Sequence, residues 1–171
     1  MTTISQYVLV EAARRVRRMS LKERERLADE IYVQQPNLLA SVLVLRQFGV
    51  TMAQMEVVLN FLLACHEAMK RSGRTWPLIT EDDQDLCLRR LTARAKFSEG
   101  LSDPQQDEVA HEAVATHPEL QLLAYAHAVL QDQGWDRIET EPLKMLVLCM
   151  LNLVECVAYR APNEPSGRRH C

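Results

Sequence analysis

Glycine and aromatic residues are scarce in this chain of 171 residues. It contains five glycines, and Phe, Trp and Tyr together make up 5% of its residues. Such a chain has little backbone suited to cradling phosphates, and it lacks both the phosphate-binding glycine loop and the nucleophile elbow of hydrolases. Apolar and polar residues nowhere alternate for long, so the sequence gives no support for β-strands.

Motifs for metal binding and covalent catalysis are missing as well. The five cysteines include no Cys-x-x-Cys pair, and four lie in predicted helices, which is typical of reduced, buried thiols in the cytoplasm. His111 and Glu112 resemble the start of a zinc-protease helix, but Ala115 occupies the second ligand position. Consecutive helical residues point about 100° apart, so the Cys-His-Glu tripeptide at 65–67 does not converge on one atom. We therefore expect no metal, no cofactor and no catalytic residue.

Long apolar runs and a strong charge imbalance are also absent. The longest uncharged apolar run, at 145–154, is too short to cross a bilayer and contains Asn152. No signal-peptide pattern opens the chain. A formal net charge of −3 gives no general reason to expect an acidic membrane or a nucleic acid as the partner. These features predict a cytoplasmic protein without a membrane partner.

Helix-forming residues dominate what remains, and they predict an all-α bundle of about eight helices. Capping residues and glycine or proline stops set the expected boundaries. Two of these signals are capping boxes that begin at Ser20 and Thr51, and Asn37 is the expected cap of the third helix. The expected helices span residues 3–19, 20–34, 38–48, 51–71, 80–98, 103–116, 118–133 and 140–159.

Two of these helices are apolar around most of their circumference. They are the segments 57–69 and 143–157, each with one narrow polar stripe that includes Glu67 in the first and Glu155 in the second. A helix of this kind must be surrounded by protein. We expect these two segments to lie against each other at the centre of the bundle.

The second half of the chain resembles a diverged copy of the first. A shift of about 82 residues aligns Ser20–Glu23 with Ser102–Gln105, and Pro36–Leu38 with Pro118–Leu120. The sequence thus suggests two pseudo-symmetric four-helix halves in one compact domain. The halves would span 1–73 and 81–160, with a linker at 74–80 and a disordered tail at 161–171.

Residues 41–60, which read SVLVLRQFGVTMAQMEVVLN, resemble the helix-turn-helix of bacterial DNA-binding regulators. Gly49 stands at the turn, and apolar residues occupy the positions expected around it. The resemblance implies that the second helix enters the major groove of DNA. That helix carries the acidic Glu56, however, and has no Lys or Arg before Lys70. An ordinary corner between two helices is the alternative.

Two clusters of arginines are candidate contacts for an anion or a nucleic acid. They comprise Arg14, Arg15, Arg17 and Arg18 in the first helix, and Arg89, Arg90 and Arg94 in the fifth. Acidic residues crowd both neighbourhoods, so a solvated, salt-bridged surface is the other interpretation. Trp76 and Trp135 each follow a glycine turn after a long helix. Each is expected either to close one end of the core or to form part of an interface.

The first functional hypothesis is a non-enzymatic, cytosolic protein-interaction module, such as an adaptor, inhibitor or regulatory subunit, that presents helical surfaces to a protein partner. A homodimer through apolar helices is compatible with it. The second hypothesis is a nucleic-acid-associated regulator that uses the basic helix faces and the helix-turn-helix-like corner. An enzyme built on the tripeptide at 65–67 has the least support.

Overall fold

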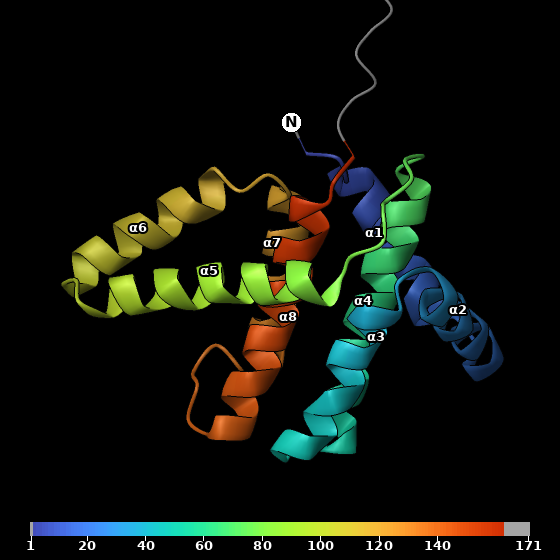
Figure 1. The fold of residues 1–171 in the computed structure, drawn as a ribbon, viewed down its shortest axis with the longest axis horizontal. Coiled ribbons are helices and arrows are strands. Elements are labelled where there is room, and N and C mark those ends of the chain that lie inside the picture. The colour runs from blue at the N-terminus through green and yellow to red at the C-terminus, as the bar shows by residue number, and fades with distance from the viewer. Residues whose placement is uncertain (1, 163–171) are drawn as a thin grey trace, which may run out of the picture.

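The computed structural model describes residues 2–162, and these form eight α-helices, one short 3-10 helix and no strand. The predicted all-α bundle is therefore confirmed. The helices are α1 (Gln6–Arg18), α2 (Leu21–Gln34), α3 (Pro36–Leu43), η1 (the 3-10 helix, Val44–Phe48), α4 (Met52–Arg71), α5 (Glu81–Glu99), α6 (Asp103–Ala115), α7 (Leu120–Asp132) and α8 (Glu141–Tyr159) (Figure 1). Most of the predicted tail, residues 163–171, lies outside the described part of the chain.

Local capping signals account for most helix starts. The side chains of Ser20, Thr51 and Thr80 each accept a hydrogen bond from the backbone N–H three residues later. The side chain at that later position in turn accepts a hydrogen bond from the backbone N–H of the cap residue. These reciprocal bonds satisfy backbone donors that have no partner inside the helix. The capping boxes expected at Ser20 and Thr51 are thus confirmed.

Three helix starts differ from the prediction. The first helix begins at Gln6 with Ser5 as its cap, three residues later than expected. The third helix begins at Pro36 with Gln35 as its cap, two residues earlier than expected, and it changes to 3-10 geometry at Val44. Proline is well tolerated in the first helical turn because its missing N–H has no partner there. The seventh helix begins at Leu120 rather than Pro118, with Glu119 at the cap position.

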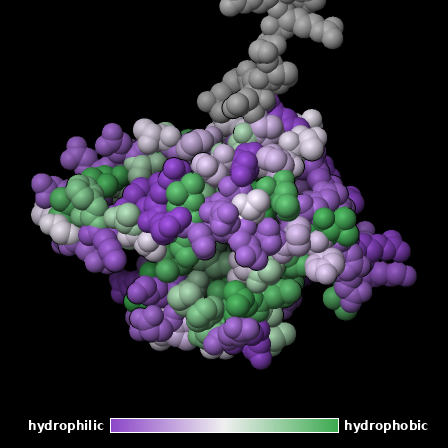
Figure 2. Space-filling view, viewed as in Figure 1, coloured by the Kyte–Doolittle hydropathy of each residue, from purple (hydrophilic) through white to green (hydrophobic). Residues whose placement is uncertain are grey.

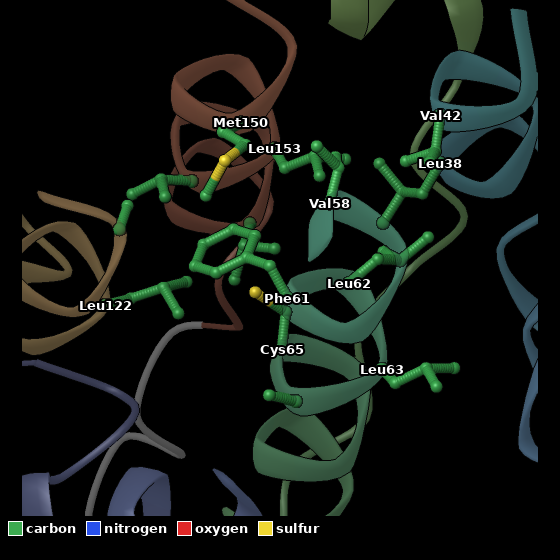
Figure 3. Close-up of a cluster of buried hydrophobic side chains, with 14 of the residues drawn as sticks. Leu38, Val42, Val58, Phe61, Leu62, Leu63, Cys65, Leu122, Met150 and Leu153 are labelled. Carbon is green, nitrogen blue, oxygen red and sulfur yellow. The ribbon is translucent and has the colours of Figure 1, made fainter. Parts of the chain in front are cut away.

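The two apolar helices lie at the centre, as predicted. α4 packs against α1, α2 and α3, α8 packs against α5, α7 and η1, and α4 and α8 contact each other. Figure 3 shows Phe61 of α4 pointing toward Met150 and Leu153 of α8 and Leu122 of α7. By length and composition α8 could cross a membrane, but core helices pass the same test, and here its apolar residues belong to the central cluster.

The two halves share one pattern of contacts. In each half the first helix packs against the last, α1 on α4 and α5 on α8. Gln35 and Glu119, the residues before α3 and α7, are both buried. Gln35 accepts the backbone N–H of Ile79 at 2.9 Å, and Glu119 accepts that of Ile4 at 3.1 Å. Each side chain therefore holds the segment that leads into the first helix of the other half.

The reciprocal contacts of Gln35 and Glu119 are what a pseudo-twofold axis would produce. The second helices of the two halves differ, however. α2 buries Leu27 and Ile31, whereas α6 buries no residue. Together with α5, α6 forms an arm that extends away from the rest of the bundle (Figure 1). The internal duplication is not confirmed and stays a hypothesis.

Substituting Gly49 by alanine should destabilise the protein more than the same change at Gly134. Both glycines have left-handed backbones, with φ of 83° and 70°, which costs a residue with a Cβ atom about 1–2 kcal/mol. At Gly49 a Cβ atom would also lie 3.3 Å from Cγ of Pro142, whereas at Gly134 it would meet nothing within 4 Å. Urea unfolding followed by circular dichroism measures both variants. Equal losses would show that the Pro142 contact contributes nothing.

Candidate functional site

A cavity of about 590 Å³ lies between the α5–α6 arm and helices α7 and α8. Most of its wall surface is apolar, and its polar side chains include two arginines, two histidines and one glutamate. The apolar wall residues are Leu91, Ala110, Ala113, Val114, Leu123, Leu151 and Ala158. Cavities of this size, with apolar walls and a few convergent polar groups, are typical of binding sites.

An ion pair between α5 and α8 crosses this cavity. Glu155 of α8 binds the guanidinium group of Arg94 from α5, and Nε2 of His117 lies 3.5 Å from the same carboxylate oxygen. Burial raises the pKa of Glu155, but the neighbouring His117 and the charge of Arg94 outweigh this effect and hold the pKa below its usual value. The carboxylate is therefore charged at neutral pH.

His117 has one ring nitrogen without a hydrogen-bond partner. Its Nδ1 accepts the backbone N–H of Glu119 at 3.1 Å, so the ring proton lies on Nε2. Nε2 is buried and makes no hydrogen bond to any residue of the described chain. Its neighbouring acceptor is the Glu155 carboxylate at 3.5 Å, which is long for a hydrogen bond.

The cavity mouth is positively charged. Arg90 lies over the ring of Tyr159, 5.5 Å from its centroid, and Arg94 also lines the cavity. Arg89, the third arginine of this predicted cluster, is exposed and lies outside the cavity lining. Burial lowers the pKa of His127, the second histidine in the lining, so it is neutral at neutral pH.

A second ion pair holds α5 and α8 together at one end. Arg160 donates from Nε and Nη2 to the two carboxylate oxygens of Asp83, at 2.8 and 2.7 Å. This pairing holds the pKa of Asp83 below its usual range. Bidentate contacts of this kind fix orientation as well as distance. They fix the relation between two of the helices that form the cavity.

The thiols at and near the cavity are unsuited to nucleophilic chemistry. Cys87 lines the cavity, and burial raises its pKa. The thiol of Cys156 lies next to that of Cys87, and burial raises its pKa as well. A nucleophilic cysteine needs a thiolate, which these environments disfavour.

The three side chains of the tripeptide at 65–67 have different surroundings and do not converge on one point. Cys65 is buried in the core, Nε2 of His66 lies 3.2 Å from Glu30, and Glu67 pairs with Arg15 and Arg71. Within residues 2–162, no group of three or more metal-ligating side chains lies close enough to hold an ion.

The first arginine cluster is split by the helix that carries it. Arg14, Arg15 and Arg18 line a hollow together with Arg71 of α4. Arg17 lies on another side of α1, where it lines a small pocket with Tyr125 of α7. The sequence identified the three α1 residues, but it gave no indication that Arg71 joins them.

The two tryptophans lie in different surroundings. Trp76 is 8% exposed, and its Nε1 donates to the carbonyl oxygen of Val157 at 3.0 Å. Trp135 is partly buried against the core after the end of α7. Trp76 thus contributes to the core near the end of α8.

The segment that resembles a helix-turn-helix comprises the end of α3, η1 and the first turns of α4. Its second helix, α4, is packed against α1, α3 and α8. Asn60, one of its few polar side chains, accepts a hydrogen bond from Arg24 at 3.1 Å. The residues exposed at the start of this helix are Thr51, Met52, Ala53 and Glu56. None of them is a cation, so this face has little with which to bind DNA phosphates or base edges.

A smaller apolar groove, of about 160 Å³, lies between η1, α5 and α8. Val44, Phe48, Leu88, Met145 and Leu148 are among its lining residues. Figure 2 shows hydrophobic surface on this face of the molecule, below α5. Val44 and Phe48 belong to the helix-turn-helix-like segment, so that segment contributes more apolar than cationic surface.

Comparison of the chain with known protein families, with characterised proteins and with solved structures finds no match.

Proposed function

We propose that the protein is a non-enzymatic, cytoplasmic interaction module that binds an acidic amphipathic segment of a partner protein in the cavity between α5, α6, α7 and α8. The observation that carries this proposal is the combination of apolar walls with a cationic mouth in that cavity. A large apolar side chain of the partner would fill the interior, and a neighbouring carboxylate would meet the mouth. Apolar anchors in well-packed pockets supply most of the binding energy in many interfaces.

Charge complementarity selects an acidic partner. Two arginines, Arg90 and Arg94, line the cavity against one carboxylate, that of Glu155. The chain as a whole carries a net charge of −3, so this mouth is positive on a protein that is negative overall. Such local contrast steers association and disfavours basic partners.

The α6 wall of the cavity is held by few buried contacts. α6 has no buried residue, and it packs mainly against its chain neighbours α5 and α7. Displacing such a helix exposes little additional apolar surface, so the opening free energy is low. A partner segment could therefore enter without disturbing the α4–α8 centre.

Selection of peptides from a random phage-displayed library tests this proposal. The expected peptides carry a large apolar residue next to Asp or Glu. Arg94→Gln and Val114→Trp should each weaken their binding about tenfold or more, the first by removing a charge and the second by filling the cavity. Arg89→Gln is the matched control, because it removes the same charge from α5 outside the cavity.

Fluorescence anisotropy with a labelled selected peptide measures these affinities. Failure to enrich any peptide, or equal weakening by Arg94→Gln and Arg89→Gln, would contradict the proposal. Enriched peptides without acidic residues would contradict the assigned partner chemistry.

A further inference from the structure

Four arginines surround a hollow of about 320 Å³ between α1 and α4, away from the α5–α8 cavity. Arg14, Arg15 and Arg18 come from α1, and Arg71 comes from the last turn of α4. Glu11, Met19 and Glu23 complete the lining. The guanidinium groups thus converge from helices that are distant in the sequence.

A buried carboxylate holds two of these arginines in place. Glu67 is 5% exposed, and its Oε1 lies 3.2 Å from Nε of Arg15 and 3.0 Å from Nε of Arg71. Both contacts use Nε, and neither arginine donates from its terminal nitrogens to any residue in the described range 2–162. Glu67 therefore fixes the position of the Arg15 and Arg71 guanidinium groups, and their terminal nitrogens can donate to an anion.

Arg18 is a further available cation. No carboxylate of residues 2–162 lies within ion-pair distance of it, whereas Arg14 pairs with Glu11 at 3.0 Å. The carboxylate of Glu23 accepts the backbone N–H of Ser20 at 2.7 Å as part of the α2 capping box, so it is already engaged. Four guanidinium groups thus face three carboxylates, those of Glu11, Glu23 and Glu67.

We infer that this hollow binds the phosphate group of a small ligand. Guanidinium forks match the geometry of phosphate oxygens, and a phosphate offers the several acceptors that the available donors require. The hollow is compact, and the carboxylates of Glu11 and Glu23 lie in its lining beside the arginines. An extended polyanion would have to pass these carboxylates, whereas a small phosphate group fits among the guanidinium groups, which favours a compact ligand over a nucleic acid.

Isothermal titration calorimetry with pyrophosphate tests this inference. The full chain should bind it saturably, and Arg18→Gln and Arg71→Gln should each raise the dissociation constant about tenfold. Arg17→Gln is the matched control, because Arg17 immediately precedes Arg18 in α1 but lines a different pocket. Its dissociation constant should stay within about twofold of the wild-type value.

Arg18→Gln is the decisive variant, since Arg18 has no ion pair to lose within residues 2–162 and its removal should leave the fold intact. Thermal unfolding of each variant checks that its fold is intact. Absence of saturable pyrophosphate binding, or an equal effect of Arg17→Gln, would overturn the inference. Tight binding of a short single-stranded DNA that pyrophosphate does not displace, and that Arg18→Gln weakens, would overturn it in favour of a nucleic-acid surface.

Discussion

Replacing Phe61 by alanine should lower the free energy of unfolding by about 4 kcal/mol. Phe61 is 1% exposed and lies where α4, α7 and α8 meet (Figure 3). Its ring also stacks on that of Tyr125, with centroids 5.4 Å apart. The substitution therefore removes apolar burial, leaves a cavity between three helices and abolishes an aromatic pair, each of which destabilises the folded state.

Phe97→Ala is the matched control, because it makes the same chemical change at a side chain that is 66% exposed on α5. It should change the free energy of unfolding by less than about 0.5 kcal/mol. Phe61→Leu keeps most of the volume and should cost about 1 kcal/mol. Urea titration followed by circular dichroism measures all three. Similar losses in Phe61→Ala and Phe97→Ala would show that the α4–α8 contact is not the centre of the core.

The sequence contains enough local information to place most helices. Capping residues such as Ser20, Thr51 and Thr80 satisfy backbone donors within a single turn, so their effect does not depend on the rest of the fold. The centre of the bundle was also predictable, because α4 and α8 are too apolar to lie at a surface. At Pro36 and Glu119 the prediction was wrong by two residues, since proline fits inside a first turn as well as before it.

The candidate sites depend on contacts that no local pattern encodes. The α5–α8 cavity exists because α6 contacts α5 and α7 without burying any residue of its own. The loose packing of α6 depends on the whole fold and has no signal in the local sequence. His117 gave no signal in the sequence beyond its failure to fit a zinc motif, because its contacts with Glu155 and with the backbone of Glu119 form only in the folded chain. Arg71 likewise joins the α1 arginines only because α1 packs along α4.

The tertiary contacts of the buried polar side chains that precede α3 and α7 were also not predictable from the sequence. Gln35 and Glu119 occupy positions where short polar residues usually cap a helix, but neither caps its own helix. Gln35 instead accepts from Ile79 and donates to the carbonyl oxygen of Pro77 at 2.9 Å. Glu119 accepts from Thr3 and Ile4. These side chains join the halves by holding backbone that would otherwise be buried without partners.

Glu119→Ala should therefore lower the free energy of unfolding by about 3 kcal/mol. The carboxylate is fully buried and accepts two backbone N–H groups, from Thr3 at 2.8 Å and from Ile4 at 3.1 Å. Hydrogen bonds to a charged group are strong, and without the carboxylate the buried N–H of Ile4 has no acceptor. The residues before α1 can avoid that penalty only by detaching, which would expose the buried Ile4 side chain.

Hydrogen exchange distinguishes this mechanism from a general loss of stability. In Glu119→Ala the Ile4 amide should exchange much faster than amides in the α4–α8 centre, because the N-terminal segment opens first. Glu119→Gln retains one acceptor oxygen and should lose about half as much free energy. Glu108→Ala removes an exposed carboxylate from α6 and should have almost no effect. If Glu119→Ala unfolds at the same urea concentration as Glu108→Ala, the contact between Glu119 and the N-terminal segment does not hold the halves together.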